Sequence, residues 1–362
     1  MSDNVEMIAD SVEQLLKGHM TTAVLEASEE GRWAGELWTA IEDAGYTRLL
    51  LSEKNGGTGE GWVDAQPLLY ALGYHSVPLP VADTMVANAL LEQAGLPLEA
   101  GPCALVQQLS TSAFELRLDG ECLTVSGEAR NVPWASFASR IIMAGYAGSH
   151  GVIAVLDPKS KGMAITPGRN IAGEPSDTLS FTNCTCSCFA EVDGLLVDEP
   201  LLVYGALARA AQIAGLLDWV LSQTLKHAKE REQFGKPLIA QQAVKQSLAV
   251  LACEAVAADV AARAACESVA APGHEFEVGV AKVRAGQAAG VAARIAHQIH
   301  GAMGFTYEHA LHHATRRLWS WRVEFGNEAL WAHKIGQLAI SCGGAAFWPN
   351  MTARRSGVSE PV

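Results

Sequence analysis

The sequence predicts an α+β protein made of a helical part, a β part and a second helical part. Apolar residues recur every three or four positions through the first hundred residues and again after about residue 198, which is the spacing of a buried helix face. Between these stretches the chain consists of short Val, Ile, Leu, Thr and Ser runs broken by glycine and proline. We expect a helical domain at 1–102, a β domain at 103–197, a second helical domain at 198–346 and a tail at 347–362.

Composition excludes several classes of protein. With 49% hydrophobic and 18% charged residues, the chain of 362 residues is globular and not disordered. Its formal net charge of −13 argues against a nucleic-acid binder, which needs a basic surface against phosphates. The acidic start Met1–Glu6 is neither a signal peptide nor a transit peptide, and no uninterrupted apolar run is long enough to span a membrane. We therefore expect a cytoplasmic protein with no membrane span.

The first domain is expected to be helical throughout, with one glycine-rich turn. Apolar stripes predict helices around Val12–Leu16 and Trp33–Ala44, and again over Asp64–Gly73 and Val81–Ala94. The glycine-rich run within Leu49–Gly61 lacks the Gly-Lys-Ser/Thr of a Walker loop and the spaced glycines of a Rossmann turn. It therefore gives no evidence of nucleotide binding in this domain.

The middle domain is expected to be an antiparallel β-barrel or sandwich. The strand Phe114–Leu118 runs into Asp119-Gly120, a dipeptide that supports a tight hairpin turn. Further strands are predicted over Ile141–Ala144, Gly151–Leu156 and Leu179–Phe181. Several short strands separated by glycine and proline are typical of small all-β domains.

The cysteines do not predict a metal site. Cys184, Cys186 and Cys188 alternate at strand spacing, so in a strand all three would point to one face. The pattern C-x-C-x-C lacks the paired C-x-x-C spacing of common zinc sites. We expect reduced thiols on a strand and no bound metal.

The junction between the first two helices of the last domain carries candidate binding residues. An apolar stripe over Leu207–Leu221 predicts a long helix, and the glycine and proline of Arg231–Leu238 end it. Arg231, Phe234 and Gln242 then offer a cation, an aromatic ring and a carboxamide, which suit an anionic, aromatic cofactor such as a dinucleotide. The residues alone leave open a simpler interpretation, an arginine that stabilises the helix dipole and a core phenylalanine.

Two motifs in this domain resemble signatures of the acyl-CoA dehydrogenase family. The run Arg231-Glu232-Gln233-Phe234-Gly235, with Gln242 seven residues later, resembles its flavin-binding signature, and a second resemblance lies in Gln298-Ile299-His300-Gly301-Ala302-Met303-Gly304-Phe305-Thr306. The resemblance implies an N-terminal helical domain, a middle β-barrel and a C-terminal four-helix bundle. It further implies FAD, an acyl-CoA thioester substrate, an electron-transfer flavoprotein as partner, and a dimer or tetramer of like or unlike chains. Short members of this kind include the chains of heteromeric steroid-CoA dehydrogenases.

The resemblance also assigns expected cofactor contacts. Arg231 would pair with the pyrophosphate of FAD, with Phe234 and Gln242 bordering the nucleotide, and a partner chain would add Gln298, His300 and Gly301. The strand beside the flavin ring would be Val132, Pro133 and Trp134, and Asn327 is a further expected contact. Pro133 replaces the usual threonine and has no N–H to donate, and a core role for Trp134 remains open.

The catalytic glutamate that the family uses to remove a proton is missing from both of its usual positions. Counting twenty residues beyond Phe305 reaches Phe325, and the alternative position at the start of the long helix is Gly205. Three explanations remain open. Glu324 acts after a one-residue shift of the turn, another carboxylate such as Glu328 reaches in, or a partner chain brings the base to a non-catalytic subunit.

Overall fold

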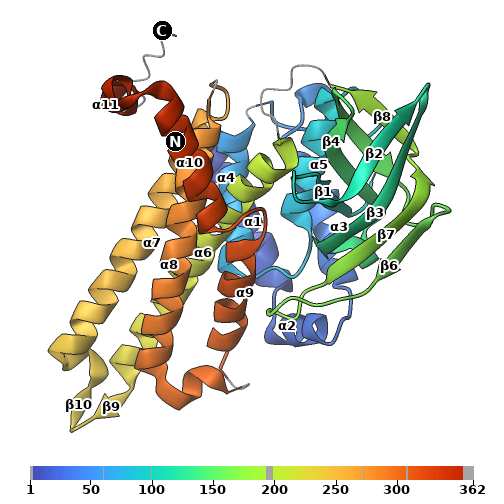
Figure 1. Cartoon of the computed structure of the whole chain (residues 1–362). Helices are drawn as coiled ribbons and strands as arrows, with labels where there is room; N and C mark the ends of the chain where they lie inside the picture. The colour runs from blue at the N-terminus through green and yellow to red at the C-terminus, as the bar shows by residue number, and fades with distance from the viewer. Residues whose placement is uncertain are drawn as a thin grey trace.

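The computed structural model describes residues 3–59, 61–98, 100–192, 199–271, 273–306 and 309–353. Figure 1 shows a β domain beside a bundle of long helices, with the N-terminal helices against both. The predicted order of helical, β and helical parts is confirmed, and each part begins where the periodicity of apolar residues changes.

The N-terminal part consists of helices α1 (Asp3–His19), α2 (Thr22–Glu29), α3 (Gly35–Asp43), α4 (Trp62–Tyr74) and α5 (Val81–Gln93). Helix α4 packs directly on the first helix of the C-terminal bundle, α6. Gly73 and Gly215 allow this approach, because a Cβ at either position would collide with a backbone carbonyl of the other helix. The N-terminal helices therefore share one hydrophobic core with the bundle.

The β domain contains two four-stranded sheets in the orders β1-β4-β5-β8 and β2-β3-β7-β6. Their strands are β1 (Cys103–Gln107), β2 (Ala113–Asp119), β3 (Cys122–Pro133), β4 (Arg140–Ala147), β5 (His150–Leu156), β6 (Met163–Thr166), β7 (Ser176–Thr185) and β8 (Cys188–Glu191). The predicted hairpin is present as β2–β3, closed by Gly120 in the left-handed region at φ 61°. The strands were expected to be antiparallel, but β1 and β4 pair in parallel. The β2–β3 hairpin lies between these two strands in the sequence.

The first sheet is buried on both faces, which explains its uninterrupted apolar strands. Ile141 and Met143 point into the core between the two sheets, whereas Ile142 and Ala144 point into the core shared by the helices. A sheet covered on both sides needs apolar residues at every position. This sheet therefore fixes the β domain to the helical parts.

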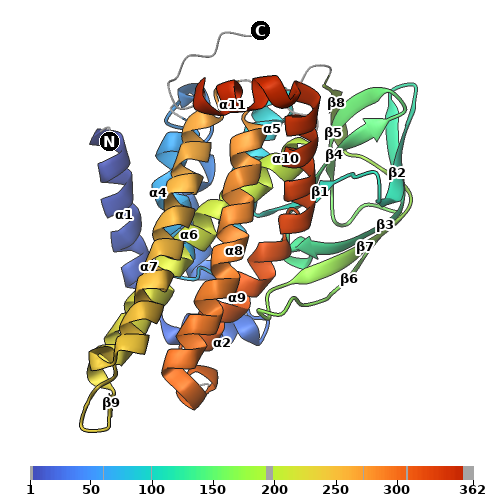
Figure 2. The same cartoon turned by 60° about the vertical axis from the view of Figure 1, so that its left-hand side comes forward.

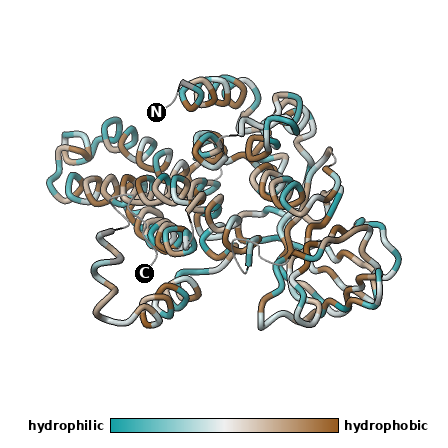
Figure 3. Tube along the Cα trace, turned by 90° about the horizontal axis from the view of Figure 1, so that it is seen from above, coloured by the Kyte–Doolittle hydropathy of each residue, from teal (hydrophilic) through white to brown (hydrophobic). Residues whose placement is uncertain are grey.

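The C-terminal part is a bundle of α6 (Pro200–Glu230), α7 (Gln242–Ser268), α8 (Glu275–His300) and α9 (Leu311–Val323), followed by α10 (Glu328–Cys342) and α11 (Gly344–Ala353). Helices α6, α7 and α8 run side by side (Figure 2). By length and composition α6 could cross a membrane, but its most apolar window is 100% buried inside the protein. In Figure 3 the apolar stretches of the helices lie mostly toward the interior. Helix α6 is therefore the central helix of the bundle.

Two local expectations are wrong. The segment expected as a loose tail contains α11, which includes Trp348 and Pro349, while residues 354–362 lie outside the described residues. Cys184 and Cys188 are not on one strand, because β7 and β8 belong to different sheets and the chain crosses between them at Cys186. Spacing in the sequence could not distinguish a continued strand from such a crossing.

Candidate active site

The structure divides the expected site residues between two places, which we call the bundle end and the β-side cavity. The bundle end comprises Arg231, Phe234, Gln242, Gln298, His300 and Gly301, at the far ends of α6 and α8. The β-side cavity lies between the β domain and the turn after α9 and contains Val132, Pro133, Glu324 and Phe325. Figure 1 shows the hairpin of the bundle end pointing away from the β domain.

A short hairpin carries the first motif at the bundle end. Strands β9 (Glu232–Gln233) and β10 (Lys236–Pro237) pair antiparallel between α6 and α7. Phe234 and Gly235 form the turn with φ of 55° and 74°. The side chain of Phe234 is 91% exposed, so its interpretation as a core phenylalanine is wrong. Arg231 is exposed as well, and its N–H donates to the carbonyl of His227 at 2.8 Å.

The second motif reaches the same bundle end through stacked imidazoles. His300 is 5% exposed and stacks on His227 of α6, with ring centroids 4.3 Å apart. The pKa of His300 is lowered to about 4, chiefly by burial and also by the nearby His227 and His309. Gln298 and Gly301 are exposed beside it. The two motifs of one chain therefore form one surface.

The β-side cavity has a volume of about 470 Å³. It is lined by the end of β3, by the β1–β2 segment and by the turn after α9, including Arg130, Asn131, Val132, Pro133, Leu202, Glu324, Phe325 and Gly326. Its lining combines apolar side chains such as Leu105 and Phe325 with polar ones such as Gln107 and Arg130. Val132 and Pro133 therefore line a cavity, and their contact with a flavin stays a prediction.

Trp134 occupies a different environment from Val132 and Pro133. Its side chain is 6% exposed and its ring packs edge-on against Trp33 of the N-terminal part, with centroids 6.3 Å apart. Phe137 lies against both tryptophans. The structure thus places Trp134 in the contact between the β domain and the N-terminal helices.

Gly205 and Phe325, the two positions at which the sequence resemblance predicts a catalytic glutamate, are neighbours in space. A Cβ built on Gly205 of α6 would lie closer than 3.0 Å to three ring atoms of Phe325. The ring of Phe325 fills the place of a side chain at position 205. Neither position holds a group that could accept a proton.

Glu324 lines the cavity but is held by an ion pair. Its side chain is 13% exposed, and Oε2 accepts a hydrogen bond from Nε of Arg209 at 2.7 Å. Asn170 donates to Oε1 at 3.3 Å. Burial raises the pKa of Glu324, although the guanidinium of Arg209 acts in the opposite direction.

Arg209 is a central residue that the sequence analysis missed. Its side chain is 4% exposed and binds Asp83 of α5 at 3.1 Å as well as Glu324. Its guanidinium carbon lies 5.5 Å from the ring centroid of Phe325. A single arginine within the apolar stripe of α6 was the signal that could have revealed it, because a buried cation requires a buried anion.

The other two candidates near the turn have structural partners. Glu328 pairs with Arg322. Asn327 caps α10, because its Oδ1 accepts from the N–H of Leu330 at 3.0 Å. Both side chains are therefore bound within the turn.

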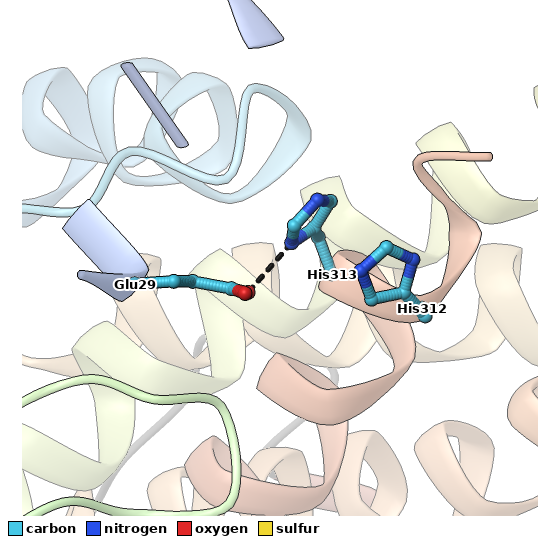
Figure 4. A group of neighbouring side chains, drawn as sticks. All are labelled: Glu29, His312 and His313. Carbon is cyan, nitrogen blue, oxygen red and sulfur yellow. Dashed lines mark hydrogen bonds and ion pairs between the residues drawn. The ribbon is translucent and has the colours of Figure 1, made fainter. Parts of the chain in front are cut away.

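A cluster of Glu29, His312 and His313 has ligand atoms that all lie within 4.8 Å of one another (Figure 4). Oε1 of Glu29 is 2.6 Å from Nδ1 of His313 and also accepts from Arg316 at 3.2 Å. A permanent cation on the carboxylate opposes binding of a metal cation. We interpret the cluster as an ion pair that connects α2 to α9.

Two family models match most of the chain. Residues 2–96 match the family description "Acyl-CoA dehydrogenase, N-terminal domain" and residues 193–338 match "Acyl-CoA dehydrogenase, C-terminal domain". Acyl-CoA dehydrogenase IpdE2 of Mycolicibacterium smegmatis is 25% identical over 313 residues, 85% of this chain and 90% of the relative.

Two solved structures share the fold. The ChsE4–ChsE5 complex from Mycobacterium tuberculosis has a TM-score of 0.84 at 19% identity, covering 93% of this chain and 97% of that chain. The Tcur3481–Tcur3483 steroid ACAD has a TM-score of 0.86 at 22% identity, covering 94% and 98%. The chain therefore belongs to the acyl-CoA dehydrogenase family, whose members are flavoprotein oxidoreductases of fatty acid and steroid degradation.

Proposed function

We propose that this chain is one subunit of a two-chain, FAD-dependent acyl-CoA dehydrogenase, in which it helps to hold the flavin and a partner chain supplies the catalytic carboxylate. The reaction is the α,β-desaturation of an acyl-CoA thioester. A base removes the proton beside the thioester carbonyl, and FAD, when bound, accepts the hydride from the next carbon. The contact between Phe325 and Gly205 carries the proposal.

Without a general base, the activation barrier of the proton-removal step would be too high for this chain to catalyse the reaction alone. A positioned general base contributes roughly 100- to 10,000-fold to the rate, about 2.7–5.5 kcal/mol of barrier. The ring of Phe325 cannot accept a proton, and it also occupies the space that a glutamate at position 205 would need. In this proposal, therefore, neither position 205 nor position 325 of this chain supplies the base.

The position of the bundle end supports a flavin site shared between chains. Arg231 and Phe234 are exposed at a hairpin that points away from the chain's own β domain (Figure 1). A guanidinium there can bind a pyrophosphate, and an exposed ring can cover a nucleotide or another chain. In this proposal Arg231, Phe234, Gln242, Gln298, His300 and Gly301 bind the nucleotide end of FAD.

The β-side cavity would hold the ring end of a flavin. Val132 and Pro133 would lie along the ring, with one hydrogen-bond donor fewer because proline has no N–H. The neighbours named for two chains, ChsE4–ChsE5 and Tcur3481–Tcur3483, support an assembly of unlike chains. We further propose a cytoplasmic enzyme that passes electrons to an electron-transfer flavoprotein.

A second candidate is an enzyme that works as a single kind of chain and uses Glu324 as its base. Glu324 lines the cavity, and burial raises its pKa toward the range useful for proton transfer at neutral pH. The ion pair with Arg209 is the observation against this role, because the carboxylate is already engaged.

Purification of the chain alone and with a co-expressed paralogue distinguishes the two candidates. We expect the chain alone to be colourless, or yellow but not bleached by any acyl-CoA tested, and the two-chain complex to be yellow and bleached. Bleaching by the chain alone would overturn the proposal. Glu324→Gln should then lower turnover at least about 100-fold if Glu324 is the base, and should leave turnover of the two-chain complex nearly unchanged if it is not.

A further inference from the structure

Lys282 is a buried cation that binds three backbone carbonyls. It projects from α8 and is 1% exposed. Its Nζ donates to the carbonyls of Trp321 at 3.3 Å, Arg322 at 2.7 Å and Gly326 at 2.8 Å. An ammonium group has three N–H donors and no acceptor, so these three bonds use its full capacity.

These carbonyls belong to the end of α9 and to the turn that carries Glu324 and Phe325. The last carbonyls of a helix have no partner inside the helix and lie at the negative end of its dipole, where a cation is favourable. Lys282 thus satisfies, from a neighbouring helix, groups that α9 itself leaves unpaired.

The turn needs such support because its backbone is strained. Phe325 has a φ of 52°, which is unfavourable for a residue with a side chain, and Gly326 follows at 90°. A Cβ at Gly326 would lie 2.8 Å from Nε1 of Trp331, the same atom that donates to the carbonyl of Phe325 at 2.9 Å. Lys282 and Trp331 therefore bind the turn from two sides.

We propose that Lys282 is a positioning residue whose ammonium group fixes this turn, and so places the Phe325 ring against Gly205 and the Glu324 carboxylate against Arg209. Lys282 positions the turn whichever chain carries the catalytic base. Only its effect on flavin retention rests on the proposed function.

The surroundings of Lys282 make the support sensitive to pH. The pKa of Lys282 is lowered to about 7, chiefly by burial and also by the cations of Arg209 and Arg322, while Glu324 and Glu328 act in the opposite direction. A neutral amine keeps only two N–H donors, so loss of the proton releases one of the three carbonyls. The turn should loosen as the pH rises through neutrality.

Hydrogen exchange of a peptide covering 320–331 tests this directly in the full chain, with rates corrected for the intrinsic pH dependence of exchange. The amides of Glu324, Leu330 and Trp331 report on the turn, because each donates a hydrogen bond within it. In the unmodified protein we expect protection to fall about tenfold between pH 6 and 8.5, the effect of losing one charge-assisted bond. Protection at pH 6 that is equal in Lys282→Met and in the unmodified protein would overturn the proposal.

Two variants and one control separate positioning from general stability. Lys282→Met should give low protection of the turn that no longer depends on pH. Lys282→Arg, which stays charged, should restore protection and remove its decline up to pH 8.5. Lys334→Met removes a lysine of α10 that pairs with Glu199, and this variant should behave as the unmodified protein. If Lys282→Met does not fold, a decline that persists in Lys282→Arg still overturns the proposal.

Flavin retention by the two-chain complex gives a separate readout. We expect retention to fall with pH in the unmodified complex and to be flat in Lys282→Arg. A complex that never binds flavin would contradict the proposed function and leave the exchange result to decide the role of Lys282.

Discussion

The aromatic ring of Phe325 fills the space in which a side chain at Gly205 would lie, since a Cβ there would come closer than 3.0 Å to three of its ring atoms. The two residues are far apart in the sequence, one in the first turns of α6 and one in the turn between α9 and α10. These are the two positions at which the sequence resemblance predicts a base, and in this chain a ring lies against a residue without a side chain there.

Gly205→Ala should therefore destabilise the protein by about 1–3 kcal/mol, the usual cost of overpacking a filled core. In a Phe325→Ala background the same change should cost much less, because the colliding ring is gone. Urea unfolding of the four proteins gives the coupling energy. Gly336→Ala on α10 is the control, since nothing lies within 4 Å of its built Cβ and a helical alanine should stabilise slightly. Additive effects would mean that the two residues do not share this space.

Arg209→Met should cost about 3–5 kcal/mol, because it leaves the carboxylates of Asp83 and Glu324 buried without their cation. The matched control is Arg263→Met, which breaks an ion pair to Asp259 with 45% of the arginine side chain exposed and should cost at most about 1 kcal/mol. Denaturant midpoints measure both. Equal losses in the two variants would contradict the importance we give to the buried pair.

Acid should weaken the bundle end through His300. Its pKa is about 4 in the folded chain and 6.5 ordinarily, so the unfolded chain binds more protons between these values and stability falls as the pH drops through this window. The loss should be roughly 1.4 kcal/mol at pH 5.5 and roughly 3 kcal/mol near pH 4. Unfolding measured at several pH values should show a shallower decline in His300→Gln, while His19→Gln, at an exposed site, should keep the original slope. Parallel curves for all three would contradict this role.

Arg231→Ala should weaken flavin retention roughly 10- to 100-fold in the complex that binds it, the effect of removing one charge-assisted bond to a phosphate. Absorbance of the flavin after dialysis measures retention. Lys229→Ala, which removes a positive charge at the exposed end of α6, is the control and should have little effect. Because Arg231 is exposed, its replacement should leave the unfolding midpoint nearly unchanged, so a loss of flavin cannot be attributed to unfolding.

Much of the fold could be predicted from the sequence, because helix and strand periodicities are local. The hairpin at Gly120 and the end of α6 before Arg231 follow from the residues at those points. The parallel β1–β4 pair and the sheet crossing at Cys186 could not be predicted in this way. They depend on which strands meet after the chain has passed elsewhere, and a local pattern does not contain that information.

The two family motifs can be read from the residues along the chain, and so can the absence of a carboxylate from positions 205 and 325. The tertiary structure alone decided that Phe325 lies against Gly205, that Glu324 is bound by Arg209, and that the ring of Phe234 is exposed. The physical reason for this difference is that a motif consists of residues close together in the sequence, along one helix or turn. Filled space, ion pairing and exposure instead arise where α5, α6 and the turn after α9 pack together, and only the folded chain brings those segments into contact.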